Sequence, residues 1–231
     1  MHRSRPFRTL AILLLVALPA ITFAQIELIP RSVLFGNPER TDPEISPDGT
    51  MLAYLAPDQG VLNVWVRTLG KTDDRVITND RKRGIRNFSW QYDSKSILYG
   101  QDQGGDENWR LYDVDLDAPA AADGQAGWAK RDLTPFEGIQ ARVIAARKSH
   151  RDEVLVGINR DNPQLHDVYR LDLVTGELTK IADNPGFIDW IADAQLTVRG
   201  TIAPQPDGSL VVLVRDSADA DWRPLIALDE K

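Results

Sequence analysis

The chain has 231 residues, of which 42% are hydrophobic and 26% are charged, and its formal net charge is −7. This is the composition of an ordinary globular protein, and it excludes a largely disordered chain. Removing the first 24 residues, which contain three arginines and no acidic residue, changes the net charge to −10. An acidic body without a basic stripe disfavours nucleic-acid binding. Because the chain has no cysteine, disulfides and thiolate zinc sites are excluded.

Residues 1–24 have the layout of a secretory signal peptide. Arg3, Arg5 and Arg8 precede an apolar segment at 10–18, and Thr22-Phe23-Ala24 approximates a cleavage pattern of small residues. A membrane anchor is the competing interpretation, but the 15 residues of 10–24 fall short of the ~20 that a spanning helix needs. We expect cleavage after Ala24, a periplasmic or secreted protein and no membrane attachment afterwards. N-terminal sequencing of the exported protein checks this.

One strand-like pattern occurs three times in the remaining chain. An aliphatic residue, an aromatic residue, two variable residues, Thr or Asp, and then Leu occur at 64–69, 111–116 and 168–173, at spacings of 47 and 57 residues. Periods of roughly 40–50 residues in strand-like sequence are typical of propeller blades. A second alignment places Tyr54 and Tyr99 in one register, each in an apolar run after a tight turn such as Ser46-Pro47-Asp48-Gly49.

These repeats predict an all-β fold, since no apolar period of 3.6 residues is sustained after the signal segment. We expect a partial β-propeller at 41–231, with about four blades of four antiparallel strands in an incomplete ring. The blades are expected at about 41–84, 85–138, 139–185 and 186–231. A sandwich could also hold sixteen short strands, but it gives no reason for four copies of one pattern.

Three segments outside the strands are assigned from composition. Residues 25–40 contain two prolines and a glycine around Leu34-Phe35, and we expect an irregular lead-in with at most one edge strand. Residues 118–129 are rich in Ala, Asp and Gly and are expected to form a loop insertion. The basic run Arg81-Lys82-Arg83 is expected to be a solvated loop between blades.

Several stretches resemble the start of a serine peptidase of the prolyl-oligopeptidase family, of the acylaminoacyl-peptidase or dipeptidyl-peptidase type. They are Ile29-Pro30 with Leu34-Phe35, "ISPDGTMLAYLA" at 45–56, "NVWVRTL" at 63–69, "GGDENWRLYDVDL" at 104–116 and "GFIDW" at 186–190. The resemblance covers nearly all of residues 27–225. It implies an N-terminal propeller, usually of seven or eight blades, followed by an α/β-hydrolase domain with catalytic Ser, Asp and His.

The chain departs from that family in lacking the catalytic part. None of its nine serines lies in the G-x-S-x-G context of a nucleophile elbow. A triad also needs a histidine base, and beyond the signal segment only His150 and His166 are present, both in expected turns. We therefore predict no catalytic residue and no peptidase activity for this chain alone, and whether the chain is an enzyme depends on sequence outside it.

No cofactor or metal is expected. Asp113, Asp115 and Asp117 alternate like the start of a calcium loop, but Ala118-Pro119 stands where that loop needs glycine, so a solvated strand face is favoured. The candidate substrate-binding residues are Asp106, Glu107 and Asn108. Their acidic side chains could bind the free α-amino group of a peptide by charge-assisted hydrogen bonds, although the bare sequence favours the simpler interpretation that Gly and Asn shape a hairpin there.

The sequence thus supports two functions. The first is the N-terminal propeller part of a secreted serine peptidase, which gates the access of peptide substrates to a hydrolase domain absent from this chain. The second is a free-standing periplasmic propeller similar to TolB that binds other proteins. Reading the coding sequence past Lys231 would distinguish them, because only the first continues into more blades and a G-x-S-x-G elbow.

Overall fold

The structure of the chain is a computed structural model that describes residues 28–118 and 128–228. The predicted signal peptide and most of the predicted loop insertion at 118–129 lie outside these ranges. Residues up to Gly36 form one unit and residues from Asn37 onward form another. No helix in the described ranges is long and apolar enough to cross a membrane.

The first unit contains the helix α1 (Arg31–Phe35), where the sequence suggested an irregular segment or an edge strand. The backbone carbonyl of Pro30 accepts hydrogen bonds from the amides of Val33 (2.9 Å) and Leu34 (3.3 Å). Proline is well suited to the start of a helix because its fixed φ matches the first turn. The composition rule for prolines therefore missed a single helical turn.

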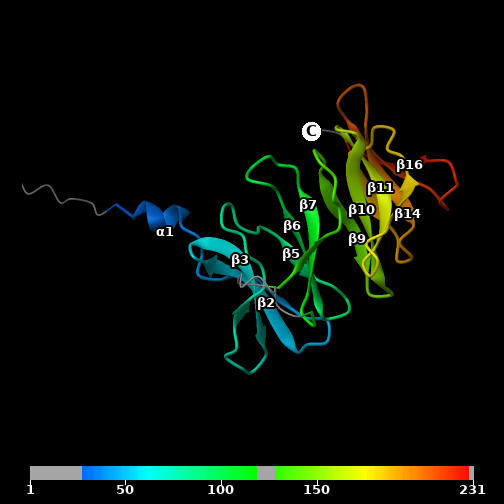
Figure 1. The fold of residues 1–231 in the computed structure, drawn as a ribbon. Coiled ribbons are helices and arrows are strands. Elements are labelled where there is room, and N and C mark those ends of the chain that lie inside the picture. Colours follow the sequence, from blue (N-terminus) through cyan, green and yellow to red (C-terminus); the bar gives the residue numbers. More distant parts are fainter. Residues whose placement is uncertain (1–27, 119–127, 229–231) are drawn as a thin grey trace, which may run out of the picture. The chain divides into compact units, whose positions relative to one another are not determined.

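The second unit consists of four antiparallel sheets of four strands each, and they follow one another along the chain (Figure 1). The first two sheets contain β1 (Thr41–Ile45), β2 (Met51–Asp58), β3 (Val61–Thr68) and β4 (Arg75–Val76), and then β5 (Phe88–Trp90), β6 (Ser96–Gln101), β7 (Arg110–Asp115) and β8 (Lys130–Asp132). The last two contain β9 (Ala141–Arg147), β10 (His150–Asn162), β11 (Leu165–Asp172) and β12 (Leu178–Ala182), and then β13 (Asp189–Ala192), β14 (Val198–Pro204), β15 (Leu210–Val214) and β16 (Arg223–Leu228).

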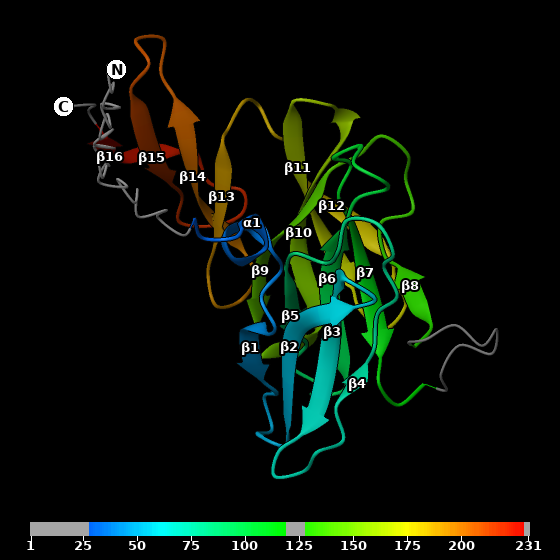
Figure 2. The same cartoon turned by 90° about the vertical axis from the view of Figure 1, so that its left-hand side faces the viewer.

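Each sheet is a simple meander in which every strand pairs with the next one in the sequence (Figure 2). The first strands of neighbouring sheets also meet, since β1 contacts β5 and β9 contacts β13. We call the four sheets blades 1 to 4. At two of the three seams between blades, the first strand of one blade therefore lies against the first strand of the next.

The repeated aromatic residues occupy equivalent positions, as the sequence predicted. Trp65, Tyr112 and Tyr169 lie on the third strands of blades 1, 2 and 3, and Tyr54 and Tyr99 lie on the second strands. Tyr54 pairs with Trp65, and Tyr99 pairs with Tyr112, in each case between the second and third strands of the blade. A shift of one residue would turn these side chains to the other face, so the repeat fixes the register.

In blades 1 and 2, a second repeated contact joins the end of the fourth strand to the third strand. The hydroxyl of Thr78 accepts a hydrogen bond from the amide of Val64 (2.9 Å), and the hydroxyl of Thr134 accepts one from the amide of Leu111 (3.0 Å). Both threonines are buried. Because a buried amide without a partner is costly, these threonines complete the backbone hydrogen bonding where the fourth strand ends.

Apolar side chains fill the space between successive blades. Ile77 and Ile97 belong to a core that joins blades 1 and 2, Leu111 and Val156 to one that joins blades 2 and 3, and Leu155 and Trp190 to one that joins blades 3 and 4. These residues alternate along their strands with residues that face the other side, as expected for sheets buried on both faces.

Hydrogen bonds across the seams run mainly from a side chain of one blade to a backbone carbonyl of its neighbour. The indole of Trp90 donates to the carbonyl of Glu44 (3.1 Å), and the indole of Trp190 donates to the carbonyl of His166 (2.9 Å). Arg131 donates to the carbonyl of Val174 (2.7 Å) and Arg147 to that of Ala192 (2.9 Å). The seams therefore combine apolar packing with directional bonds to the main chain.

Candidate functional site

The three residues singled out by the sequence lie together in the turn between β6 and β7. Asp106 and Glu107 are exposed and Asn108 is partly buried. The backbone of Glu107 has a φ of 58°, a left-handed value that few residues other than glycine adopt. We call residues 104–108 the acidic turn. Its geometry must be held by its surroundings, because the conformation of Glu107 is unfavourable by itself.

The two acidic residues of the acidic turn have different roles. A carboxylate oxygen of Asp106 accepts hydrogen bonds from the amides of Gln103 (3.0 Å) and Asn108 (3.1 Å), and the other accepts one from the side-chain amide of Asn108 (3.1 Å). Desolvation opposes ionisation, but the hydrogen bonds from Asn108 and Gln103 outweigh it and hold the pKa of Asp106 below its usual value. Asp106 therefore shapes the turn as an anion.

Glu107 is the carboxylate that remains available. Its side chain is exposed, and within the described ranges it has no hydrogen-bond or ion-pair partner. Its backbone carbonyl accepts a hydrogen bond from the side chain of Gln140 (3.1 Å), which belongs to blade 3. The amide of Gln140 donates in turn to the side chain of Asn159. The neighbouring blade thus fixes the backbone that presents the Glu107 carboxylate.

Arg83 lies on the other side of the acidic turn. Its guanidinium lies 3.6 Å from a carboxylate oxygen of Asp102, whose side chain is almost fully buried. It also lies directly over Gly105, so that an added Cβ there would collide with it, and Gly105 has a φ of 99°. Glycine suits this position because of its backbone conformation, and the exposed end of the Arg83 side chain fills the space that a Cβ would take.

The basic run 81–83 is exposed and lies in the loop between β4 and β5, as the sequence predicted, although its two arginines form ion pairs. Arg81 forms an ion pair with Asp58 (2.8 Å), and the carboxylate of Asp80 accepts hydrogen bonds from the amides of Arg81 (2.9 Å) and Arg83 (3.0 Å). The sequence analysis did not identify Gln140 as a residue that contacts the acidic turn. No local pattern pairs Arg83 or Gln140 with the turn, although the double glycine at 104–105 was a signal of close backbone contact.

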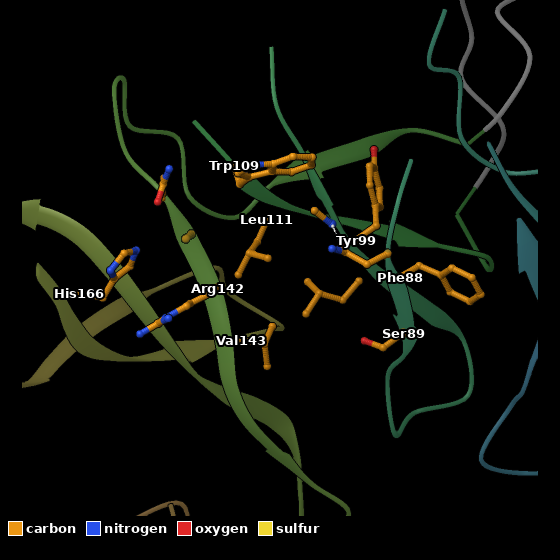
Figure 3. A pocket seen from close by; sticks show the side chains of 13 residues that line it. Phe88, Ser89, Tyr99, Trp109, Leu111, Arg142, Val143 and His166 are labelled. Atoms are coloured by element: carbon orange, nitrogen blue, oxygen red, sulfur yellow. Dashed lines mark hydrogen bonds between the residues drawn. The ribbon is translucent and has the colours of Figure 1, made fainter. Parts of the chain in front are cut away.

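A cavity of about 530 Å³ lies beside the acidic turn, between blades 2 and 3 (Figure 3). Trp109, which directly follows Asn108, lines the cavity together with Tyr99 and Leu111 from blade 2 and Val143 from blade 3. Gln140 lines it as well, so that one residue contacts the turn and borders the cavity. Gln140 therefore links the acidic turn to this cavity in the seam between blades 2 and 3.

The two histidines lie in strands, not in the turns expected from the sequence. His150 begins β10 and pairs with Arg147, because the hairpin turn needs only Lys148 and Ser149. Its Nδ1 lies 2.7 Å from a carboxylate oxygen of Glu153. His166 lies in β11 and borders the cavity, and its burial and then the charge of Arg142 lower its pKa. This shift favours the neutral imidazole over the charged one.

The aspartates that suggested a calcium loop are used in separate contacts. Asp113 is buried and lies 3.1 Å from Arg131, and its burial raises its pKa despite that arginine. Asp117 is exposed and lies 2.6 Å from Lys95. In residues 28–118 and 128–228, no group of three His, Cys, Asp or Glu side chains is placed to hold a metal ion.

The sequence is similar to dipeptidyl peptidases. It is 42% identical over 201 residues to the dipeptidyl aminopeptidase BIII of Pseudoxanthomonas mexicana, and 33% identical over 200 residues to the dipeptidyl peptidase family member 6 of Caenorhabditis elegans. Each alignment covers 86% of this chain. The resemblance to the prolyl-oligopeptidase family is confirmed. The chain spans only 28% and 26% of the lengths of these two relatives, and no protein-family model matches it.

Solved structures confirm the propeller fold. Oligopeptidase B from Leishmania major matches 82% of this chain with a TM-score of 0.54 at 15% identity, over 27% of its own chain. TolB from Acinetobacter baumannii matches 81% of this chain with a TM-score of 0.51 at 18% identity, over 43% of its own chain. The propeller domain of the Trilobed protease from Pyrococcus furiosus matches 81%, with a TM-score of 0.52 at 19% identity, over 58% of that chain. The fold is thus an all-β propeller, with four four-stranded blades in residues 28–118 and 128–228.

Proposed function

We propose that this chain is the propeller part of a periplasmic or secreted serine peptidase of the prolyl-oligopeptidase family. In this proposal the propeller gates the access of peptides to a hydrolase domain outside this chain, and the acidic turn binds the free α-amino group of the substrate. The resemblance to two dipeptidyl peptidases supports the first part. The second part rests on one observation, the unpartnered and exposed carboxylate of Glu107 on a turn whose backbone is hydrogen-bonded to Gln140.

The physical basis is the pairing of opposite charges at a preformed position. A peptide ammonium donates up to three hydrogen bonds, and a bond between ionised partners is shorter and about twice as strong as a neutral one. The hydrogen bond from Gln140 holds the backbone of Glu107. Because the turn is already ordered, binding would not have to offset the entropy of ordering it.

The test is calorimetric titration of the chain with an amidated tetrapeptide, Gly-Ala-Ala-Ala-amide, in its free and N-acetylated forms. We expect the free form to bind and Glu107→Gln to weaken its affinity by about 10- to 100-fold, since a hydrogen bond to a charged group contributes about 1.5–3 kcal/mol. Acetylation should weaken binding to the native chain by a similar factor, and it should have little further effect on Glu107→Gln.

Asp93→Asn serves as the matched control. Asp93 is an exposed aspartate in the turn between β5 and β6, and its carboxylate accepts hydrogen bonds from the amides of Lys95 (2.8 Å) and Ser96 (3.0 Å), much as that of Asp106 does. It should leave peptide affinity unchanged. Equal binding of the free and acetylated peptides would contradict the proposal. Binding of folded proteins without any dependence on a free amine would instead favour the TolB-like binding module.

A further inference from the structure

Two arginines lie directly opposite each other in blade 4. Gly200 of β14 pairs with Val214 of β15, so that Arg199 and Arg215 occupy the next position along these two neighbouring strands (Figure 2). The amide of Arg215 donates to the carbonyl of Arg199 (3.0 Å). Like charges that face each other across an antiparallel strand pair are destabilising. We call Arg199 and Arg215 the facing arginines, and a negatively charged partner would offset their repulsion.

Backbone groups and one aromatic ring hold the facing arginines in place. Nε of Arg199 donates to the carbonyl of Arg215 (2.8 Å), and Nε of Arg215 donates to the carbonyl of Val198 (2.9 Å). The guanidinium of Arg215 also lies over the ring of Trp222, 4.5 Å from its centroid. Among the described residues, no acceptor bonds to the Nη groups of Arg215. These donors are therefore ordered and unoccupied, which lowers the entropic cost of binding a ligand.

Two more arginines, both from blade 3, contact the turn between β13 and β14. The guanidinium of Arg147 donates to the carbonyl that directly precedes this turn (2.9 Å), and that of Arg170 donates to the carbonyl of Leu196 within it (3.4 Å). The turn also contains Asp193, whose carboxylate lies 3.4 Å from the guanidinium of Arg199. Four arginines thus gather at this end of the seam between blades 3 and 4. We call Arg147, Arg170, Arg199 and Arg215 the arginine cluster.

The arginine cluster carries more positive charge than its carboxylates balance. Arg170 and Arg199 have one carboxylate partner each, at 2.8 and 3.4 Å. Among the described residues, neither Arg147 nor Arg215 has a carboxylate at ion-pair distance. Burial lowers the pKa of Arg215, the charge of Asp219 opposes this from beyond ion-pair distance, and the charge of Arg199 adds to it. Two positive charges thus remain without a paired carboxylate, although the chain beyond residue 24 has a net charge of −10.

A small, doubly charged oxyanion matches these two unpaired charges. A planar guanidinium donates two parallel N–H bonds to the oxygens of a phosphate or carboxylate group. The side chains of Arg170 and Arg199 are 35% and 40% exposed, so that solvent reaches the cluster. An anionic membrane would instead meet the net negative charge of the rest of the chain, which repels it.

We infer that the arginine cluster is a binding site for a small dianion such as inorganic phosphate, with Arg199 and Arg215 as its direct ligands. The site does not depend on the proposed function, because the cluster lies at the seam between blades 3 and 4 and the acidic turn lies at the seam between blades 2 and 3. Because Arg147 and Arg170 connect blade 3 to the turn of blade 4, a bound dianion would also strengthen the contact between these two blades.

The test is calorimetric titration of the full chain with inorganic phosphate, and separately with acetate, at one ionic strength and at about pH 8, where phosphate is mostly a dianion. We expect saturable binding of one phosphate, with acetate at least about tenfold weaker because it carries a single charge. Arg199→Gln and Arg215→Gln should each lower the affinity for phosphate by about 10- to 100-fold, since each removes charge-assisted hydrogen bonds. Phosphate should also raise the melting temperature of the native chain more than that of either variant.

Arg142→Gln is the matched control. Arg142 likewise joins blade 3 to blade 4, because its guanidinium donates to the carbonyl of Ile188 (2.9 Å) and lies 3.5 Å from a carboxylate oxygen of Asp189. Ile188 precedes β13, whereas the arginine cluster surrounds the other end of that strand. Arg142→Gln should therefore leave the affinity for phosphate unchanged. If Arg215→Gln fails to fold, as judged by circular dichroism, Arg199→Gln still decides the test.

Each outcome supports or overturns the site. Saturable phosphate binding that the glutamine variants at 199 and 215 weaken, and that Arg142→Gln keeps, would support it. Equal affinity of the native chain and Arg199→Gln for phosphate, equal affinity for phosphate and acetate, or no saturation would overturn it. Co-sedimentation with vesicles that contain phosphatidic acid, lost in Arg199→Gln, would identify a lipid headgroup and overturn the choice of a small ligand. Peptide affinity should be the same in Arg199→Gln and the native chain, so that failure here leaves the proposed function unaffected.

Discussion

Replacing Thr78 by valine tests the contact that closes blade 1. The hydroxyl of Thr78 accepts the amide of Val64 and donates to the side-chain oxygen of Asn63 (2.9 Å), and all three residues are buried. Valine keeps the shape but leaves the amide of Val64 without a partner. An orphaned buried donor costs about 1–3 kcal/mol and a lost neutral hydrogen bond about 0.5–1.5 kcal/mol. We expect Thr78→Val to lower the free energy of unfolding by about 2–4 kcal/mol.

The assay is urea unfolding of the full chain, followed by far-ultraviolet circular dichroism. Thr134→Val should cost about 1–3 kcal/mol, because Thr134 accepts the single amide of Leu111. Thr179→Val makes the same chemical change at an exposed position of β12 and should stay within about 0.5 kcal/mol of the native chain. If Thr78→Val were as stable as Thr179→Val, the closing contact would not stabilise the blade, and the reasoning from the repeat would be wrong.

Two further predictions concern acid stability and solubility. Hydrogen bonding to Arg170 and then to His150, against desolvation, lowers the pKa of Glu153, so its contribution to stability is present above its unfolded pKa of about 4.5 and is lost as the pH falls through the lower folded value. Glu153→Gln should therefore flatten the decline in stability below pH 4.5, and a pH series of unfolding curves that keeps the native slope would refute this. Residues 25–231 alone should show no peptidase activity, because none of the serines lies in a G-x-S-x-G elbow. They should also associate instead of remaining monomeric, because Ile191 (47% exposed) and Ile226 (52%) lie on one apolar face of blade 4. Changing both to lysine should sharpen the monomer peak in size-exclusion chromatography, whereas a monodisperse native chain or inhibitor-sensitive peptide hydrolysis would contradict the two expectations.

The propeller fold was predictable because the sequence patterns of its strands are local and recur from blade to blade. Alternation along a strand has a period of two, so the aromatic residues at 65, 112 and 169 determine both the strand and its facing side. The acidic turn was also predictable as a unit, since its candidate residues are neighbours in the sequence. What failed were the assignments of the two histidines to turns and of residues 31–35 to an irregular segment.

The contacts that give the candidate site its character could not be predicted. Gln140 is 33 residues from Glu107, and Arg83 is in the segment that leads into blade 2. Which residues meet across a seam depends on the rotation between blades, and a single sequence carries no local pattern for that rotation. The division of roles between Asp106 and Glu107 likewise emerged only from the hydrogen bonds that occupy one carboxylate and leave the other free.

The direction of the bonds across the seams has a consequence for how such a protein can change over time. Trp90, Trp190, Arg131 and Arg147 donate to carbonyl groups of the adjoining blade, and every residue type carries a carbonyl. The accepting positions Glu44, His166, Val174 and Ala192 can therefore be replaced without loss of the bond, provided that the backbone keeps its course. Substitutions at the donors remove it. The residues that supply the accepting carbonyl groups can thus change in sequence while the hydrogen bonds from the adjoining blade are kept. Relatives whose blades have diverged can therefore retain the same contacts between blades.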